Sequence, residues 1–294
     1  MTDRYAVIGN PITQSKSPLI HALFAQATGQ DIEYSRIEGP LDGFAGAVRA
    51  FRDDGGRGLN VTAPFKLQAF EIATDRLPRA QWAGASNALK FESGRAWADN
   101  FDGEGLVIDI QRNLGVAMAG ARVLMLGAGG AARGTLLPFL NCQLETLVIA
   151  NRSAHKAQLL AAEFSPHGPV RGCGFEALAD ERFDVVINAT SASLIGDASA
   201  LSQGALPKSA LAHATLVYEM AYGKGLTPFL RAAREAGAQR VADGVGMLIE
   251  QAALSFEWWR GVRPDTRAAI AKFTVPLLSP DTAVDRSLAP QTTP

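Results

Sequence analysis

A lysine stands at an unusual place in the stretch NVTAPFK, residues 60–66. Lys66 follows Pro64 by two residues, where a helix is predicted to begin, and a cation at a helix start opposes the macrodipole at a cost of up to about 1 kcal/mol. A lysine can protonate the oxygen that remains when a carbonyl accepts a hydride, and its charge can stabilise the growing alkoxide. The candidate carboxylate partners are Asp99 and Asp102 of ADNFDGEG. A lysine in a surface ion pair is the alternative interpretation.

The run GAGGAA, residues 127–132, is a second place where chemistry is expected. It follows the apolar run ARVLMLG (121–127) and opens a helical pattern, so it fits G-x-G-x-x-G/A with Ala132 in the third slot. The glycines permit a tight turn, and the helix N-terminus presents N–H groups to a pyrophosphate. A tight strand–helix turn can need glycine without any ligand. The strands before and after this unit favour a dinucleotide site.

The next apolar run ends at ANRS, which indicates the kind of dinucleotide. A site for NAD usually has Asp or Glu near here, whereas this chain has Arg152, twenty residues after Ala132. Asn151, Arg152, Ser153 and Lys156 could instead surround a 2′-phosphate, which a planar guanidinium binds through paired donors. The alternative is that Arg152 is a solvated loop residue. The sequence predicts NADP.

Composition limits the class of protein. The chain has 294 residues, 47% of them hydrophobic and 19% charged, which predicts a globular protein of two domains. The formal net charge is -1, so the protein as a whole does not attract nucleic acid or anionic lipid electrostatically. The N-terminus lacks signal-peptide features, no apolar run approaches roughly 18 residues, and Cys142 and Cys173 lack metal-type spacing. We therefore expect two reduced thiols, no metal site, no membrane partner and a cytoplasmic location.

The histidines do not form a catalytic pattern. His21, His155, His167 and His213 are scattered along the chain. His21 lies in an apolar helical stretch and is predicted to be a packing residue. Lys66 and the aspartates near it remain the better candidates for proton transfer.

Apolar strand-like runs alternate with helical patterns in the first hundred residues. The predicted strands are 5–10, 32–37 and 58–63, and the predicted helices are 17–29 and 41–55. This rhythm predicts a mainly parallel sheet covered by helices, followed by a hairpin of SNALKF and RAWADN. A second unit starts near residue 103, with strands at 121–127, 145–151, 183–190 and 214–220 and a long apolar helix at 244–261.

The order of the motifs resembles that of shikimate dehydrogenases from about residue 5 to residue 275. The motifs that carry the resemblance are GNPITQSKSP, NVTAPFK, GASNAL, DNFDGEG, GAGGAARG, NRS, EMAYGKGLTPFL and DGVGMLIEQAA. The resemblance implies a reversible, NADP-dependent reduction of 3-dehydroshikimate to shikimate within aromatic amino-acid biosynthesis. It further implies a monomer or homodimer that acts on this small-molecule substrate.

Matched motif by motif, the resemblance also implies the site. The catalytic residues are Lys66 and Asp102. The substrate-binding residues are Ser15, Ser17, Thr62, Asn87, Asp102, Tyr222 and Gln251, with the two serines on the ring carboxylate. The cofactor-binding residues are Gly127, Ala128, Gly129, Gly130, Ala131, Asn151, Arg152, Ser153, Ala154, His155, Lys156, Met220 and Gly244. Read alone, Ser17 could simply cap a helix that starts with Pro18.

The expected fold class is α/β with two domains. An N-terminal, mainly parallel α/β substrate domain comprises residues 1–102 and 244–278, because the C-terminal helix returns to it. A Rossmann-type NADP-binding domain comprises residues 103–243, and the tail, residues 279–294, is expected to be disordered.

The sequence departs from the family pattern at three positions near these motifs. Phe101 replaces a small hydroxyl residue beside Asp102, Ala88 replaces a threonine, and Glu219 replaces an aspartate. Phe101 and Ala88 are expected to reshape the rim of the pocket. This keeps open a paralogue that acts on quinate, aminoshikimate or a related cyclitol acid. An NADP-binding regulator without catalysis is a second alternative, although such a protein would not need both Lys66 and Asp102.

Overall fold

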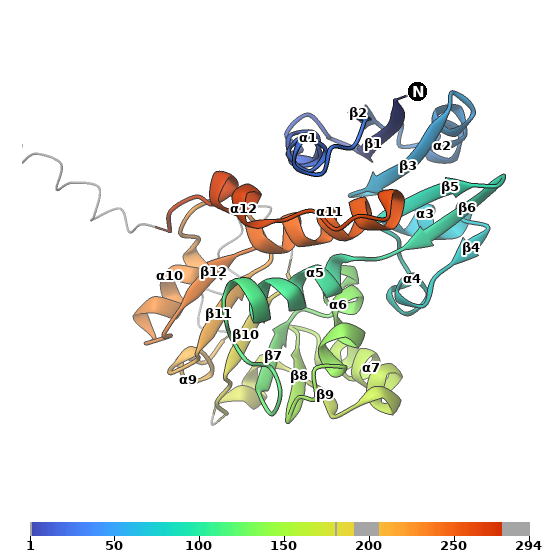
Figure 1. Cartoon of the computed structure of the whole chain (residues 1–294). Helices are drawn as coiled ribbons and strands as arrows, with labels where there is room; N and C mark the ends of the chain where they lie inside the picture. Colours follow the sequence, from blue (N-terminus) through green and yellow to red (C-terminus); the bar gives the residue numbers. More distant parts are fainter. Residues whose placement is uncertain (1, 180, 191–205, 278–294) are drawn as a thin grey trace, which may run out of the picture.

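The computed structural model describes residues 2–179, 181–190 and 206–277, in which two six-stranded sheets are joined by helices (Figure 1). The tail at 279–294, expected to be disordered, lies outside these residues. The strands are β1 (Asp3–Gly9), β2 (Ile32–Glu38), β3 (Gly56–Val61), β4 (Asp75–Arg76), β5 (Ala88–Glu92), β6 (Arg95–Asp99), β7 (Arg122–Leu126), β8 (Thr146–Ala150), β9 (Val170–Cys173), β10 (Val185–Asn188), β11 (Leu216–Glu219) and β12 (Val241–Asp243).

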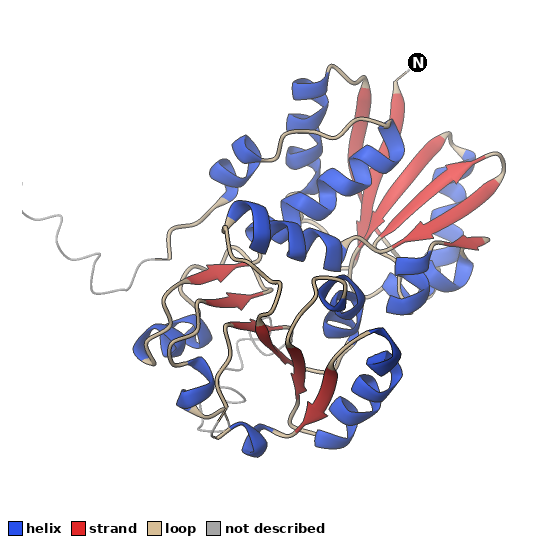
Figure 2. Ribbon diagram, turned by 60° about the horizontal axis from the view of Figure 1, so that its bottom comes forward, coloured by secondary structure: helices blue, strands red, loops and turns tan. Residues whose placement is uncertain are grey.

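The α-helices cover the faces of both sheets (Figure 2). They are α1 (Ser17–Thr28), α2 (Phe44–Asp53), α3 (Lys66–Ile72), α4 (Pro78–Ala83), α5 (Asp102–Ile108), α6 (Gly130–Leu140), α7 (Ala154–Phe164), α9 (Lys208–Leu211), α10 (Pro228–Glu235), α11 (Val245–Arg260) and α12 (Arg267–Phe273). The described residues also contain a short π-helix, η1 (Asp109–Asn113), and the 3-10 helices η2 (Ser165–His167) and η3 (Phe175–Leu178).

The first sheet has the order β2-β1-β3-β5-β6-β4, with β1 parallel to β2 and β3 and with β5–β6 as an antiparallel hairpin. Its central strands are apolar on both faces because helices cover both. Ala6 and Ile8 pack in a cluster with Phe44 of α2. On the other face, Tyr5 stacks on Trp259 of α11 with ring centroids 4.8 Å apart. The sheet is therefore enclosed by chain segments from both ends of the sequence.

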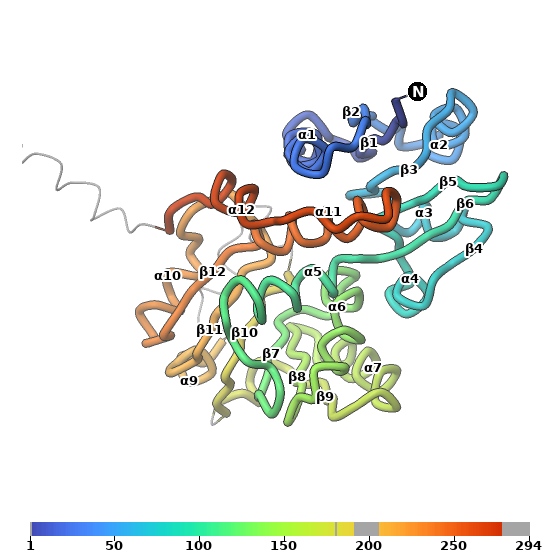
Figure 3. Tube along the Cα trace, viewed as in Figure 1, coloured from blue at the N-terminus to red at the C-terminus, as the bar shows by residue number. Residues whose placement is uncertain are grey.

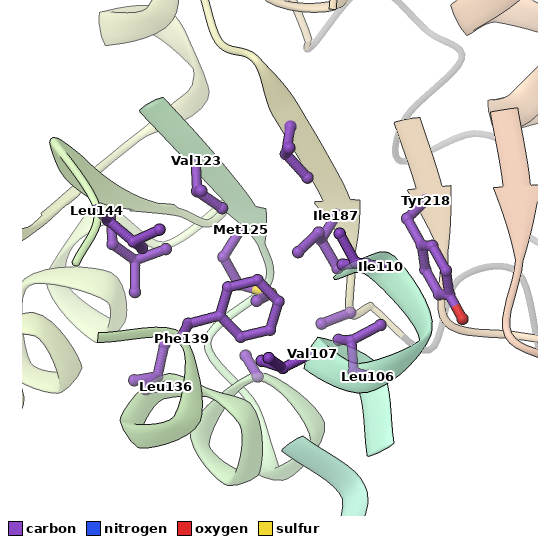
Figure 4. Close-up of a cluster of buried hydrophobic side chains, with 14 of the residues drawn as sticks. Leu106, Val107, Ile110, Val123, Met125, Leu136, Phe139, Leu144, Ile187 and Tyr218 are labelled. Carbon is purple, nitrogen blue, oxygen red and sulfur yellow. The ribbon is translucent and has the colours of Figure 1, made fainter. Parts of the chain in front are cut away.

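The second sheet has the order β12-β11-β10-β7-β8-β9, and all of its strands are parallel. This is the strand order of a doubly wound dinucleotide-binding sheet, whose crevice lies at the carboxyl ends of the strands where the winding reverses. On one face, Val123 and Met125 of β7 pack on Ile110, Leu136 and Phe139 (Figure 4). The reversal occurs between β7 and β10, so a ligand is expected to bind there.

Helix α5 connects the two sheets because it packs on α6 and α11 at once (Figure 3). Two glycines allow these close contacts. A Cβ on Gly103 would lie 2.6 Å from the carbonyl oxygen of Gly134 in α6. A Cβ on Gly105 would lie 2.8 Å from the backbone nitrogen of Gln251 in α11. The helix that begins with Asp102 is therefore held between the cofactor-side helix α6 and the returning helix α11.

The predicted fold class is confirmed, and each strand and helix predicted by residue range is present, with ends that differ by at most three residues. The largest difference is the start of α2, at Phe44 instead of Leu41. The short strands β4, β9 and β12 were not predicted, because two to four residues carry too little periodicity. Helix α5 was not predicted either, since its sequence DGEGLVI contains two glycines that disfavour a helix.

We predict that Gly105→Ala destabilises the protein by about 1–3 kcal/mol, the usual range for overpacking, because the new methyl group meets the backbone of α11. Gly46→Ala in α2 is the matched control, since a Cβ there has nothing within 4 Å. It should stabilise the protein by about 0.5–1 kcal/mol. Urea unfolding curves measure both changes. Equal stability of the two variants would contradict the close contact between α5 and α11.

Candidate active site

A cleft of about 1160 Å³ lies between the two sheets. It is lined by segments that follow β3, β7, β8, β10 and β11, by the start of α5, and by the first turns of α11. Sixteen of the residues expected to react or bind line it: Ser15, Ser17, Thr62, Lys66, Asn87, Asp102, Gly127, Ala128, Gly129, Gly130, Ala131, Asn151, Met220, Tyr222, Gly244 and Gln251. Residues that are far apart in the sequence thus share one cavity.

Lys66 and Asp102 form an ion pair in this cleft, with 2.6 Å between Nζ and Oδ2. Lys66 is the first residue of α3 and Asp102 the first residue of α5, so two helix starts bring the groups together. The carboxylate is favoured at a helix N-terminus, whereas the ammonium is not, and the contact with Asp102 offsets that disadvantage. The Lys66 side chain is 34% exposed and that of Asp102 is 17% exposed. Solvent can therefore still reach the ammonium.

The amide of Asn87 orients the carboxylate. Its Nδ2 donates to Oδ1 of Asp102 at 2.8 Å and to Oε1 of Gln251 at 3.2 Å. Its Oδ1 accepts from the backbone N–H of Phe101 at 2.9 Å, which fixes which end of the amide faces the cleft. Gln251 is held in turn by donation from Nε2 to the carbonyl of Leu248 at 2.8 Å. Both oxygens of Asp102 are thus occupied, one by Asn87 and one by Lys66.

The two serines lie at the start of α1, where the helix N-terminus favours an anion. Ser17 does not cap the helix with its side chain, so its hydroxyl is available to the cleft, where it accepts from Oγ of Ser15 at 3.2 Å. Arg36 of β2 holds the loop, because its Nη2 and Nε donate to the carbonyl oxygen of Ser15 at 2.6 and 3.1 Å. Two hydroxyl donors close to the positive charge of Arg36 are suited to binding a carboxylate.

Asn60 also lines the cleft, although the sequence analysis did not single it out. It lies on β3 two residues before Thr62, and side chains two apart in a strand share a face, so this signal was present in the sequence. Its Oδ1 accepts from the hydroxyl of Tyr34 at 2.7 Å and pairs with Nε2 of His21 at 3.1 Å. Its Nδ2 donates to Oγ of Ser255 at 2.9 Å. The amide therefore connects the cleft to a buried polar layer.

His21 belongs to this buried layer and is a packing residue, as predicted. Its ring is fully buried and stacks on Tyr34, with centroids 4.0 Å apart. Because Oδ1 of Asn60 is an acceptor, Nε2 carries the proton, and Nδ1 has no hydrogen-bond partner among the described residues. Burial lowers the pKa of His21 from 6.5 to about 3. Protonation would place a charge and an unsatisfied donor in the interior.

The glycine-rich turn has the geometry of a phosphate cradle. Gly127 has φ +106°, and a Cβ there would lie 3.2 Å from Cγ2 of Thr190. Gly129 and Gly130 face open space, since a Cβ on either would meet nothing within 4 Å, and α6 begins at Gly130. The backbone N–H groups at the start of α6 are therefore accessible to an anion of pyrophosphate size. The turn fits a dinucleotide.

The segment after β8 lies just outside the cleft wall. Asn151 lines the cleft, whereas Arg152, Ser153, Ala154, His155 and Lys156 do not. Arg152 and Lys156 are exposed and form no ion pair with any described residue, so both cations are available to a ligand. Arg152 lies two residues before α7 and Lys156 lies in its first turn, which suits a phosphate that extends beyond the pyrophosphate site.

The expectation that Phe101 and Ala88 reshape the pocket rim is wrong, because neither lines the cleft, and Glu219 does not line it either. The ring of Phe101 is buried between Trp258, with centroids 5.7 Å apart, and the guanidinium of Arg79 at 4.9 Å. The chain turns at Phe101 so that Asp102 faces the cleft and the ring faces the interior. Ala88 and Glu219 are fully buried.

Asp99, the other candidate partner of Lys66, has a structural role. Its carboxylate is fully buried and is bound by the guanidinium of Arg79 and by the backbone N–H of Asn100, the latter at 2.8 Å. It is not part of the cleft wall. The geometry thus selects Asp102 from the two aspartates.

A doubly wound sheet with a glycine-rich turn at its switch point, opposite a lysine–aspartate pair in the same cleft, defines a dinucleotide-dependent dehydrogenase. Three family descriptions match the chain: "Shikimate dehydrogenase substrate binding domain" at residues 7–89, "Shikimate / quinate 5-dehydrogenase" at 110–217 and "Shikimate 5'-dehydrogenase C-terminal domain" at 244–272. The chain belongs to the shikimate dehydrogenase family.

Individual relatives agree with this. The NADP(+) shikimate dehydrogenase of Nitrosospira multiformis is 52% identical over 95% of this chain and 100% of its own length. An Ael1 enzyme from Pseudomonas putida superposes with a TM-score of 0.90 and 59% identity, covering 94% of this chain and 100% of that one. A shikimate 5-dehydrogenase from Thermus thermophilus, solved in complex with NADP(H) and shikimate, has a TM-score of 0.79 and 29% identity, covering 93% and 100%.

The described part of the chain shows neither a membrane-spanning helix nor a cluster of metal ligands. None of its helices has the length and apolar character needed to cross a membrane. The same residues contain no group of three or more histidine, cysteine, aspartate or glutamate side chains that could hold a metal ion.

We predict that His21 makes the protein less stable in acid. The unfolded chain binds a proton at this residue below about pH 6.5, whereas the folded chain binds it only near pH 3, so stability from this group is present at neutral pH and lost as the pH falls. At pH 5 the loss amounts to about 2 kcal/mol, from about 1.36 kcal/mol per pH unit. Urea unfolding of the protein and of His21→Leu, at pH 7 and pH 5, measures the difference. Equal losses in both proteins would contradict a buried neutral ring.

Proposed function

We propose that this chain catalyses the reversible, NADP-dependent reduction of 3-dehydroshikimate to shikimate, a step in the biosynthesis of aromatic amino acids. The observation that carries the proposal is the Lys66–Asp102 pair, 2.6 Å apart, in one cleft with the glycine-rich turn of the second sheet. Membership of the shikimate dehydrogenase family and relatives named shikimate dehydrogenase (NADP(+)) at 50–55% identity support it.

In this proposal the polar residues of the cleft hold the substrate. Ser15 and Ser17 donate hydroxyl protons to the ring carboxylate, and the nearby guanidinium of Arg36 favours that negative charge. Thr62, Asn87, Asp102 and Gln251 bond to the ring hydroxyls, and Tyr222 closes the cleft near the carboxylate. Hydroxyl, amide and carboxylate groups can each donate to or accept from a polyol, which agrees with the residue types.

Lys66 moves the proton. In the reducing direction its ammonium donates a proton from Nζ to the carbonyl oxygen while the carbonyl carbon gains a hydride, and in the oxidising direction the neutral amine accepts the hydroxyl proton. NADPH, when bound, supplies that hydride. Asp102 accepts from Nζ through Oδ2 and so keeps the ammonium aimed at the oxygen, while Asn87 occupies Oδ1. Because the lysine is 34% exposed, water can replace its proton after each cycle.

The cofactor is held by the second sheet in this proposal. Residues 127–131 hold the pyrophosphate, residues 151–156 surround the 2′-phosphate, and Met220 and Gly244 lie beside the nicotinamide. Gly244 is suited to this position, since a Cβ there would lie 2.2 Å from the carbonyl oxygen of Met220. We further propose residues 1–102 with 244–278 as the substrate domain, residues 103–243 as the NADP domain, and a cytoplasmic monomer or homodimer.

Other members of the class of cyclitol-acid dehydrogenases are the main competing functions. A preference for quinate or aminoshikimate over shikimate would require a cleft wall that differs from the family pattern. The unusual residues Phe101 and Ala88 do not line the cleft, so they do not provide such a difference. A regulator without catalysis would need no ion pair aimed into the cleft. A panel of shikimate, quinate and aminoshikimate, assayed with NADP and NAD, distinguishes these functions by the preferred pair.

We predict that Lys66→Ala lowers kcat about 10²–10⁴-fold, the usual contribution of a general acid or base, and leaves NADPH binding unchanged. Asp102→Asn should also lower kcat, because it removes the charge that holds the ammonium. The measurements are NADP reduction with shikimate and titration of NADPH fluorescence. Lys90→Ala is the matched control, since Lys90 pairs with Glu92 at 3.4 Å outside the cleft and should keep full activity. Undiminished turnover by Lys66→Ala would refute its role.

We predict that Arg152→Ala raises the KM for NADP about 10- to 100-fold, as expected for a lost charged hydrogen bond of about 1.5–3 kcal/mol, and leaves the KM for NAD unchanged. The reason is that only NADP carries the 2′-phosphate. Steady-state kinetics with each cofactor at saturating shikimate measure the ratio, and Arg49→Ala, an exposed arginine of α2, is the control. A wild-type preference for NAD would reject the assignment of residues 151–156.

A further inference from the structure

Four residues follow α12, Thr274 to Leu277, and we call them the C-terminal strap. They lie between an apolar cluster beside the first sheet and one beside the second sheet. Just before it, Phe273 packs on the cluster formed by α1 and α11, which includes Ile20 and Ile249. At its end, Leu277 packs on the cluster under the second sheet, together with Leu226. The strap therefore leads from the cluster of α1 and α11 to the apolar cluster of the second sheet, which includes Phe229 and Leu230 of α10.

The strap also borders the cleft. Phe273 and Val275 are among its lining residues, with Leu248 and Tyr222. Val275 is 40% exposed and Tyr222 is 42% exposed, so both lie at the open side of the cleft. No motif of the sequence analysis includes the strap, and the proposed mechanism does not use it.

Leu277 packs against the same apolar cluster as Leu226 of the Tyr222 loop. This loop, residues 220–227, runs from the end of β11 to the start of α10. Its first half is held by Asp243, whose Oδ2 accepts from the N–H of Gly223 at 3.0 Å. Its second half is held by Thr227, which caps α10 by accepting from the N–H of Leu230 at 3.3 Å, and by the apolar contact of Leu226. Leu277 belongs to the same apolar cluster as Leu226.

We propose that the C-terminal strap is a positioning element for substrate binding, which holds the Tyr222 loop in its binding-competent conformation through Leu277. The inference rests on the proposed function, in which Tyr222 contacts the substrate. Without Leu277, the apolar cluster against which Leu226 packs loses contacts, and the loop visits other conformations. Apparent substrate affinity then falls in proportion to the competent fraction, whereas the chemistry at Lys66 is unchanged once substrate is bound.

Two truncations of the full chain test the strap. Removal of residues 274–294 deletes it, and removal of residues 280–294 leaves it in place. We expect the first truncation to raise the KM for shikimate about three- to tenfold, with kcat within about twofold of the wild type, as expected for a reduced competent fraction. The second should match the wild type. Equal KM values for the two truncations would overturn the proposal.

Point variants separate positioning from general stability. Leu277→Asp should raise the KM for shikimate as the longer truncation does, whereas Pro276→Ala, at an exposed neighbour, should not. If the effect acts through Tyr222, Leu277→Asp should have no further effect on KM in a Tyr222→Ala background. Additive effects of the two substitutions would contradict this route.

Hydrogen exchange gives a measure that does not depend on turnover. Peptides that cover residues 221–227 should exchange faster in Leu277→Asp than in Pro276→Ala, while peptides of β7 should not differ. Unchanged exchange in the Tyr222 loop would refute the proposed positioning role of the strap, even if the enzyme is active. If Leu277→Asp speeds exchange in the Tyr222 loop but the wild-type protein does not turn over shikimate, the positioning role of the strap is supported and the proposed function is rejected.

Discussion

The contact between the ammonium of Lys66 and the carboxylate of Asp102 imposes the main constraint on this structure. Lys66 is the first residue of α3 and Asp102 is the first residue of α5. The contact therefore requires the N-termini of these two short helices to lie side by side. The start of α5 is held there because Gly103 and Gly105 let it pack closely on α6 and α11. The same packing ties the carboxylate to the helix that follows the glycine-rich turn. Helix packing around α5 thus relates the Lys66–Asp102 pair to the glycine-rich turn on the other side of the cleft.

The polar layer beneath the cleft consists largely of neutral groups. Asn60, Asn87 and Gln251 have their amides oriented by defined donors and acceptors, and His21 is kept neutral by burial. Burial also raises the pKa of Tyr34 well above its ordinary value, so its hydroxyl stays protonated and donates to Asn60. These neutral groups contrast with the charged pair of Lys66 and Asp102 in the cleft above them. An uncompensated buried charge would have competed with them.

The unusual residues illustrate how neighbours in sequence separate in space. Phe101 immediately precedes Asp102, yet its ring packs on Trp258 and Arg79 while the carboxylate enters the cleft. A bulky residue beside a reacting group therefore leaves the cleft wall unchanged here. Asn60 is the opposite case, since it lies on β3 two residues before Thr62, which directly follows the strand, and both line the cleft. Strand periodicity predicts the second case, and only the turn at the start of α5 explains the first.

The sequence by itself determined the fold class, the long strands and helices, and the cofactor type, because each of these depends on local periodicity, turn chemistry and residue type. It also identified Lys66 as unusual, since an ammonium at a helix start is a local disadvantage. Apart from the family resemblance, it did not select Asp102 over Asp99, nor did it predict that Asn60 and Val275 line the cleft or that Arg36 binds the backbone of Ser15. These depend on packing between segments that are remote in the chain, such as Gly105 against Gln251, or Leu226 and Leu277 against the same apolar cluster. The tertiary structure decided them, because which side chains share a cavity depends on how the helices pack and not on local preference.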